Sequence, residues 1–420
     1  MKQQIIDFLN TYDYDVQKSG NARWIDQKCT LDVLSIIADC ILEFTQYDES
    51  VEFSIKDIWT SLYAKQNVES IFQKPSTTEI KARHEYDKFF SQPINLFAYS
   101  KLLEPSKNGN RMTFKINNKE LLEKIAIRDL NALSFLVLYI EKVLKDSGIY
   151  KLFINFLDLQ SKQSFYDLKN GFTEFTIKHT KINTPVECGR IFTKILNPLA
   201  FNHKKKGTRK GHISNTTITL DELKYNRLNW RDELSGKDKT ITRQEYSNIA
   251  PINPKAIYDI QRAKKVVRRY NERFNDGLSE IMRSSEMGIK ATQIHHIFPQ
   301  AEYEIISDYI ENLIAITPNQ HYSMAHPNNQ TTYIDKDFQY ICLLAKINTI
   351  KNDTAQIYSF ESFKIVLNIG LYTDEFSSID NLDFAALLSK IDFYYSDFNM
   401  EKYGELANLN REQFSAVFLK

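Results

Sequence analysis

The sequence predicts a mainly helical chain of the α+β class that is built from several domains. Its 420 residues include only 12 glycines and 10 prolines, about half the usual share, so turns are few and helices should dominate. Hydrophobic residues make up 42% and charged residues 25%, a globular balance that excludes wholesale disorder. At ~100–200 residues per domain, the length corresponds to two to four domains.

Neither a membrane span nor an exported protein is expected. The best apolar run, Leu133–Ile140, is far shorter than the ~20 residues that a span requires. The start, Met1–Asp7, lacks the apolar stretch of a secretory signal. We therefore expect a cytoplasmic protein. No CxxC pair exists, so free thiols are the simplest interpretation and no structural zinc site is expected. The cysteines are Cys29, Cys40, Cys188 and Cys342.

Charge is distributed unevenly, although the formal net charge is only +1. Residues 203–274 hold eighteen Lys and Arg against eight Asp and Glu, whereas residues 371–402 hold two against seven. The first stretch suits a phosphate-bearing partner and the second does not. We assign residues 201–285 to a basic region that binds a DNA backbone and residues 346–420 to a helical, acidic C-terminal region.

The basic region contains two clusters. Residues 203–212 are too charged to pack and too interrupted by glycine to form a helix. Residues 262–274 predict an amphipathic helix with an apolar stripe ~100° wide and cations over the rest. An ordinary solvated helix is the alternative, but such faces usually alternate in charge and this one is almost wholly positive. The candidates for backbone contact, which would release counterions from DNA, are Lys204, Lys205, Lys206, Arg209, Lys210, Arg262, Lys265, Arg268, Arg269 and Arg273.

The N-terminal part, residues 26–118, has the order of a winged helix-turn-helix. Helical spacing covers residues 30–45 and 55–66, and a capping box at Ser76 predicts a third helix that ends at Pro93. A hairpin follows, in which Met112, Phe114 and Ile116 alternate with polar residues. The third helix of such a fold enters the major groove of DNA. A structural helical domain with a surface hairpin is the alternative. The candidate recognition residues are Lys81, Arg83, His84 and Lys88.

Residues 119–200 predict a helical core region without chemistry of their own. The next informative segment holds four of the eight histidines. Residues 292–298 and 313–316 predict two strands. The run Thr317–Gln320 predicts a helix start with a capping box, and this helix should end before Pro327. The four histidines are His295, His296, His321 and His326.

Adjacent residues of a strand point to opposite faces, so His295 and His296 are expected to serve different functions. One can ligate a metal ion together with His321, one turn into the helix, while the other addresses water. Phosphodiester hydrolysis needs these two functions, a base that titrates near neutral pH and a divalent ion that holds the developing charge. His326 has poor helical spacing to His321 and is interpreted as a phosphate contact or a second candidate ligand.

This segment resembles the HNH, or ββα-metal, nucleases, whose pattern is [DH]-H, then N-L, then a helical His about nine residues on. His295-His296, Asn312-Leu313 and His321 match it. The resemblance implies His295 and His321 as metal ligands, His296 as general base, and Asn312 as the supporting catalytic residue that tethers the loop. Many relatives carry two CxxC pairs that this chain lacks, so its neighbours must brace the small fold.

A large chain around a small HNH unit, residues 286–345, resembles type II restriction endonucleases. The resemblance implies sequence-specific hydrolysis of double-stranded DNA with Mg²⁺, or another divalent cation such as Mn²⁺, and a companion DNA methyltransferase. A homodimer would allow both strands to be cut. Cleavage outside the recognised sequence is a further hypothesis. The alternatives are another HNH defence nuclease, nicking or modification-dependent, and a winged-helix DNA-binding protein with an inactive nuclease fold.

Overall fold

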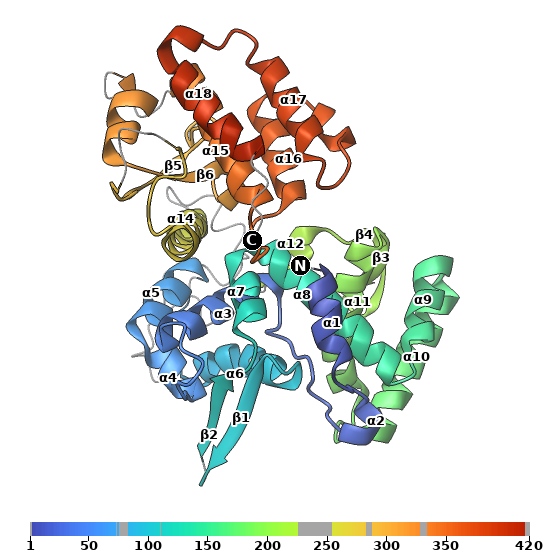
Figure 1. Ribbon diagram of the computed structural model, residues 1–420. Helices are drawn as coiled ribbons and strands as arrows, with labels where there is room; N and C mark the ends of the chain where they lie inside the picture. The colour runs from blue at the N-terminus through green and yellow to red at the C-terminus, as the bar shows by residue number, and fades with distance from the viewer. Residues whose placement is uncertain are drawn as a thin grey trace. The chain divides into compact units, whose positions relative to one another are not determined.

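The computed structural model describes residues 2–72, 74, 83–109, 111–225, 254–282, 288–327 and 334–415. The chain divides into two compact units, Met1–Lys255 and Ala256–Lys420 (Figure 1). Both are mainly helical, which confirms the predicted class, and the described strands form three antiparallel pairs. The boundary falls inside the predicted basic region 201–285. None of the described helices is both long enough and apolar enough to cross a bilayer.

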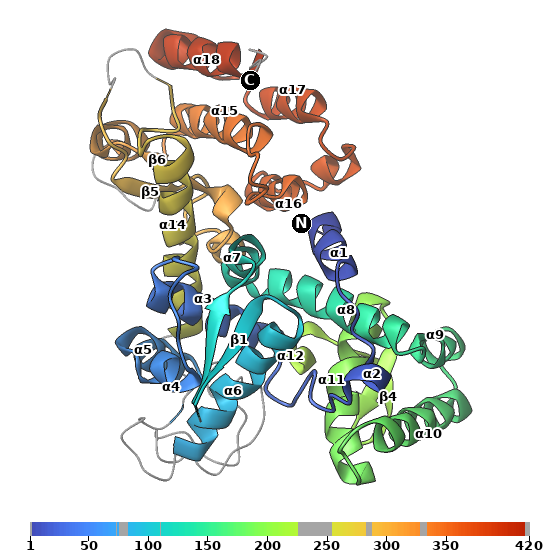
Figure 2. The same cartoon turned by 60° about the horizontal axis from the view of Figure 1, so that its bottom comes forward.

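Helix α3 (Leu31–Thr45) forms the centre of the N-terminal unit. It is buried along almost its whole length and packs against α7 (Lys119–Ile127) and α8 (Asp129–Asp146). Helices α9 (Tyr150–Leu159), α10 (Lys162–His179) and α11 (Pro185–Asn202) pack together beside this core (Figure 2). The other elements of this unit are α1 (Lys2–Asn10), α2 (Val16–Ser19), α4 (Ile55–Thr60), α5 (Leu62–Ile71), α6 (Arg83–Tyr99), β1 (Leu103–Asn108), β2 (Arg111–Ile116), α7 (Lys119–Ile127), α8 (Asp129–Asp146), α9 (Tyr150–Leu159), α10 (Lys162–His179), α11 (Pro185–Asn202), β3 (Lys206–Arg209), β4 (His212–Thr217) and α12 (Leu220–Leu223).

Two helices occupy the range 55–66 where one was predicted. Ser61 ends α4 in an extended conformation, and its side chain accepts a hydrogen bond from the Ala64 amide at the start of α5. The hairpin β1–β2 forms as predicted, and Phe53 bridges to Phe114 of β2. Met112 of the predicted apolar face is 46% exposed, because it lies near the tip of the hairpin.

The prediction that Pro93 ends the third helix is wrong. Helix α6 continues through Pro93 to Tyr99. Phe90 and Ile94 on either side of the proline are fully buried, and this packing offsets the hydrogen bond that proline removes from a helix. The capping box at Ser76 lies outside the described residues.

The cluster at residues 203–212 was expected to be too charged to pack, but it forms the hairpin β3–β4. Its centre is buried, because the Asn197 side chain on α11 accepts from the Thr208 amide at 2.8 Å and donates to the Thr208 carbonyl at 3.0 Å. Gly207 permits this approach, since a Cβ atom there would lie 2.5 Å from Asn197 Oδ1 and 2.8 Å from Ile218 Cγ1. Charged side chains at the ends of the hairpin do not prevent its middle from packing.

A buried ionic cluster stabilises the N-terminal unit around Glu85. Its carboxylate accepts from Lys28 and from the Tyr225 hydroxyl, and it lies 3.5 Å from Lys74. Burial alone would raise the pKa of Glu85, but the charges of Lys74 and Lys28 outweigh it and lower the pKa to about 2. Both lysines are buried, so this carboxylate compensates positive charge that would otherwise be unfavourable in the interior.

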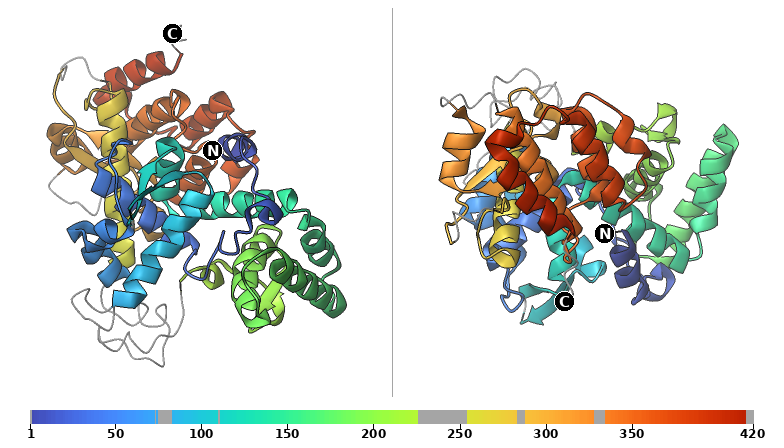
Figure 3. Two further views of the ribbon diagram at one scale, coloured as in Figure 1. Left: turned by 90° about the horizontal axis from the view of Figure 1, so that it is seen from below. Right: turned by 45° about the horizontal axis from the view of Figure 1, so that its top comes forward.

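The C-terminal unit places a strand pair and a short helix against a helical bundle. The buried helix α15 (Lys336–Lys351) packs against α17 (Phe384–Tyr394) and α18 (Met400–Ser415) (Figures 1 and 3). The elements of this unit are α14 (Pro254–Phe274, which begins at the boundary), β5 (Gln293–His296), η4 (Glu304–Ile306), η5 (Ile310–Asn312), β6 (Leu313–Ile316), η6 (Gln320–Ala325), α15 (Lys336–Lys351), α16 (Phe360–Gly370), η8 (Glu375–Ser378), α17 (Phe384–Tyr394) and α18 (Met400–Ser415).

Candidate functional site

The four histidines lie in a segment whose elements follow the predicted order of strand, loop, strand and short helix. β5 pairs antiparallel with β6, with His295 opposite Ile314. The first strand is shorter than the predicted range 292–298 and ends at His296, while the second matches its prediction. The capping box is present, since the Thr317 amide donates to Gln320 Oε1 at 3.0 Å and the Gln320 amide donates to Thr317 Oγ1 at 3.2 Å. The helix ends before Pro327, as predicted.

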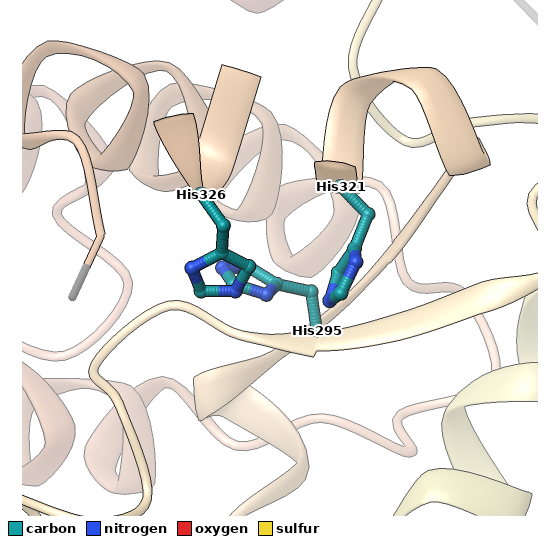
Figure 4. A group of neighbouring side chains, drawn as sticks. All are labelled: His295, His321 and His326. Carbon is teal, nitrogen blue, oxygen red and sulfur yellow. The ribbon is translucent and has the colours of Figure 1, made fainter. Parts of the chain in front are cut away.

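Three imidazoles converge where this helix faces the strand. The ring centroids are 5.3 Å apart for His295 and His321, 5.0 Å for His295 and His326, and 4.9 Å for His321 and His326. Figure 4 shows His295 rising from the strand while the other two descend from opposite ends of the helix. One candidate ligand atom from each residue lies within 4.8 Å of the other two.

The expectation that His326 has unsuitable spacing is wrong. In an α-helix, five residues turn by about 500°, which would place His326 about 140° from His321. Residues Gln320–Ala325 instead form a π-helix, whose hydrogen bonds join residues five apart. His326 follows at its end, in a non-helical conformation. The wider turn therefore brings the third imidazole to the other two.

The three histidines fit a metal ion by their chemistry. His295 Nε2 and His321 Nδ1 are buried nitrogens without a hydrogen-bond partner, and buried polar atoms are rarely left without one. Burial, followed by the neighbouring histidines, lowers the pKa of His295 well below its usual value, and burial and His326 lower that of His321. Both rings are therefore neutral near pH 7, the form that binds metals.

Binding of one ion requires the three nitrogens to approach one another by up to about 1 Å. Three nitrogens that each lie about 2.1 Å from one ion are on average at most about 3.6 Å apart, whereas the candidate atoms of the group lie within 4.8 Å of one another. Rotation of the imidazoles within their rotamers supplies such a change. The donor set and its dimensions therefore fit a single ion.

His296 has a different environment from His295. Its Nε2 lies 2.9 Å from the Ser307 carbonyl oxygen. A carbonyl only accepts, so Nε2 carries the proton and Nδ1 holds the free lone pair. Burial lowers the pKa of His296 to about 4, with a contribution from Lys264 and against the opposing effect of the Ser307 carbonyl. The ring is therefore a neutral base of fixed tautomer near pH 7.

Asn312 holds the loop that carries this carbonyl. Its fully buried side chain accepts from the Phe298 amide at 2.8 Å and donates to the carbonyls of Phe298 and Ile306 at 3.1 and 3.2 Å. Ile306 directly precedes Ser307, whose carbonyl orients His296. The side chain thus links Phe298, two residues after β5, to the residue that precedes Ser307.

The strand pair is braced by buried side chains of α15 and of the segment that follows α14. Glu280 accepts from the Ala315 amide at 2.8 Å and from Thr349 Oγ1 at 2.7 Å, and it pairs with Lys346 at 2.6 Å. Gln339 on α15 donates to the Ile297 carbonyl at 2.8 Å. These contacts connect the strand pair to α15 and to the segment that follows α14.

One cavity of about 480 Å³ joins the four histidines to Lys264 of α14. Burial lowers the pKa of Lys264, and Arg268, one turn along the helix, lowers it further. Lys264 is absent from the residues selected by sequence, because nothing distinguishes one lysine of a basic helix from the next. The remaining lining residues are Ile294, Pro299, Gln300, Ala301 and Glu304.

The cations of the basic helix are not equivalent. Arg262 was expected among the outward cations, but it is buried, pairs with Asp259 at 2.9 Å and lies over the Tyr258 ring. It therefore belongs to the packed part of the helix. Arg268 and Arg273 are exposed, and Lys265 and Arg269 are half-buried.

In the N-terminal unit, the candidate cations lie at the two ends of the hairpin β3–β4. Lys204 and Lys210 are exposed, Lys205 and Lys206 are half-buried, and Arg209 is exposed but pairs with Glu222. Among the candidate recognition residues, Lys88 is exposed on α6. Lys81 lies outside the described residues, and Arg83 and His84 belong to the first turn of α6.

Comparisons with protein-family models, with curated proteins and with solved structures find no match to this chain.

Proposed function

We propose that this protein is a metal-dependent DNA endonuclease of the HNH, or ββα-metal, type, with the site specificity of a type II restriction enzyme. One observation carries the proposal: three imidazoles converge on one point, and a fourth, His296, lines the same cavity as a neutral base of fixed tautomer. A structural role alone does not account for two buried ring nitrogens without hydrogen-bond partners.

In the proposed reaction, His296 Nδ1 takes a proton from a water molecule, and the resulting hydroxide attacks phosphorus in line. The Ser307 carbonyl keeps the opposite nitrogen protonated, so the free lone pair is always on Nδ1. Asn312 fixes the loop that holds this carbonyl. A divalent cation held by His295, His321 and His326 would neutralise charge on the pentacovalent state and on the departing 3′ oxygen.

The kind of donor atom in the site influences which divalent cation it binds. Mg²⁺ prefers oxygen ligands and keeps much of its water, whereas imidazole suits borderline transition metals. With His326 as a third nitrogen donor, the proposal moves from Mg²⁺ toward Mn²⁺, Zn²⁺ or Ni²⁺. Of the two interpretations of His326 from sequence, ligation is favoured over phosphate contact because its ring lies 5.0 Å from His295 and 4.9 Å from His321.

The proposed partner is double-stranded DNA, held by cations of both units. Recognition by residues 26–118 and cutting in the C-terminal unit would permit cleavage outside the recognised sequence. A companion methyltransferase and a homodimer that cuts both strands remain part of the proposal. The residues proposed for backbone contact are Lys204, Lys205, Lys206, Arg209 and Lys210 of the hairpin region and Lys265, Arg268, Arg269 and Arg273 of α14.

The experiment is plasmid cleavage by the purified chain, after chelation and with each of Mg²⁺, Mn²⁺, Zn²⁺ and Ni²⁺. We expect the wild type to cut with at least one ion, and His296→Ala to abolish cutting while DNA affinity in a filter-binding assay stays largely intact. If the wild type binds DNA but cuts with none of the ions, the nuclease proposal is wrong, and the alternative of a DNA-binding protein with an inactive site takes its place. Methylated and unmethylated plasmids separate restriction from modification-dependent cutting, and sequencing of the cut ends locates the break.

A further inference from the structure

Lys264 is a half-buried cation without a partner. It lines the cavity of the four histidines, and among the described residues no hydrogen bond or ion pair involves it. Among the described residues that line the cavity, Glu304 is the only acidic one, and it is exposed and does not pair with Lys264. The ammonium group therefore has no compensating anion within the described part of the chain.

The surroundings make the charged form of Lys264 unfavourable when no anion is bound in the cavity. Burial and the charge of Arg268, one turn along α14, lower the pKa of Lys264. A charge withdrawn from water without a counter-ion destabilises the fold. The potential in the cavity is therefore positive, a bound metal ion would increase it, and an anion that enters the cavity would stabilise the ammonium group of Lys264.

We propose that Lys264 is a catalytic residue of the nuclease site and contacts a non-bridging oxygen of the scissile phosphate. This inference rests on the proposed function, which brings a phosphodiester to the cavity. The assignment separates Lys264 from Arg268 and Arg273, which are exposed and do not line the cavity. Those two act on affinity for the DNA backbone, whereas Lys264 acts on the reacting group.

The contact strengthens as the reaction proceeds. Attack of hydroxide on phosphorus forms one P–O bond while the bond to the 3′ oxygen breaks, and negative charge grows on the non-bridging oxygens in between. The ammonium donates a hydrogen bond to one of these oxygens and keeps its own proton. A preorganised donor aimed at developing charge accelerates the chemical step more than it tightens binding.

The test is the single-turnover rate of plasmid cleavage with saturating enzyme and the ion that best supports the wild type. Lys264→Ala is expected to cut about 10²–10³-fold more slowly, as when one such donor is removed from an active site. DNA affinity should change by less than about threefold, because many other cations contact the backbone. Lys264→Arg should recover at least about tenfold over alanine, because it keeps the charge and a donor. The matched control is Lys390→Ala on α17, which removes a lysine that pairs with Glu375 outside the cavity, and it should cut like the wild type.

Thermal unfolding of each variant separates a structural from a catalytic role. The proposal is overturned if Lys264→Ala cuts as fast as the wild type, and the nuclease assignment then stands. It is also overturned if the arginine variant loses as much rate as alanine and both unfold at lower temperature, which would mark a packing role. If the wild type itself cuts with no divalent ion, the nuclease assignment fails, and the role of Lys264 fails with it.

Discussion

Replacement of Asn312 by alanine tests whether one buried amide holds the loop that orients the proposed base. The side chain makes three hydrogen bonds, one from the Phe298 amide and two to the carbonyls of Phe298 and Ile306. At a net ~1 kcal/mol each, their loss should make local opening easier by about 3 kcal/mol, a factor of about 100. The base should then lose its orientation, and cleavage should slow about 10–100-fold, as when an outer-shell partner of an active site is removed.

Hydrogen exchange followed by mass spectrometry measures the first effect directly. Amides of residues 298–307 should exchange about 100-fold faster in Asn312→Ala, while helix α15 should be unchanged. The control is Asn352→Ala, because this exposed asparagine makes one local bond of 3.0 Å to the Asn348 carbonyl. If Asn312→Ala exchanges and cuts like the wild type, the loop does not depend on this side chain and our explanation of the base is wrong.

Three further predictions concern stability, measured by urea unfolding. Glu85→Gln should destabilise the N-terminal unit by about 3 kcal/mol at pH 7. The pKa of Glu85 is about 2 in the folded protein, below the usual 4.5. The difference in unfolding free energy between variant and wild type should therefore be complete above pH 4.5 and vanish as the pH falls to 2. Gly207→Ala should cost about 1–3 kcal/mol, since its Cβ would overlap buried atoms, while Gly189→Ala, with open space on α11, should stabilise by about 0.5–1 kcal/mol. Glu280→Gln should destabilise the C-terminal unit by about 3–5 kcal/mol by leaving Lys346 buried and unpaired, and adding Lys346→Met should recover most of that loss.

The sequence predicted features that depend on neighbouring residues more reliably than features that depend on packing with distant parts of the chain. The strand at Leu313–Ile316 and the capping box at Thr317 depend on neighbours within a few residues, and both predictions are confirmed. The continuation of α6 through Pro93 depends on aromatic packing from elsewhere in the chain. Local sequence rules contain no term for that packing.

The candidate site divides in the same way. The convergence of His295 and His321 was predicted from motif spacing, whereas His326 was left between phosphate contact and ligation because α-helical geometry, which the π-helix does not obey, gave it poor spacing to His321. Lys264 lies about thirty residues before the histidines, and the brace of Glu280 by Lys346 joins positions far apart in the chain. Such pairs become visible only when the tertiary fold is known.

Isothermal titration of the metal-free chain with Zn²⁺ and with Mn²⁺ at neutral pH tests the central claim most directly. We expect one ion per chain, with affinity reduced at least about 100-fold in His295→Ala and His321→Ala and about tenfold or more in His326→Ala. His179→Ala, at the end of α10 in the other unit, should bind like the wild type. A wild type that binds neither ion, or histidine variants that bind as tightly as the wild type, would contradict the metal centre.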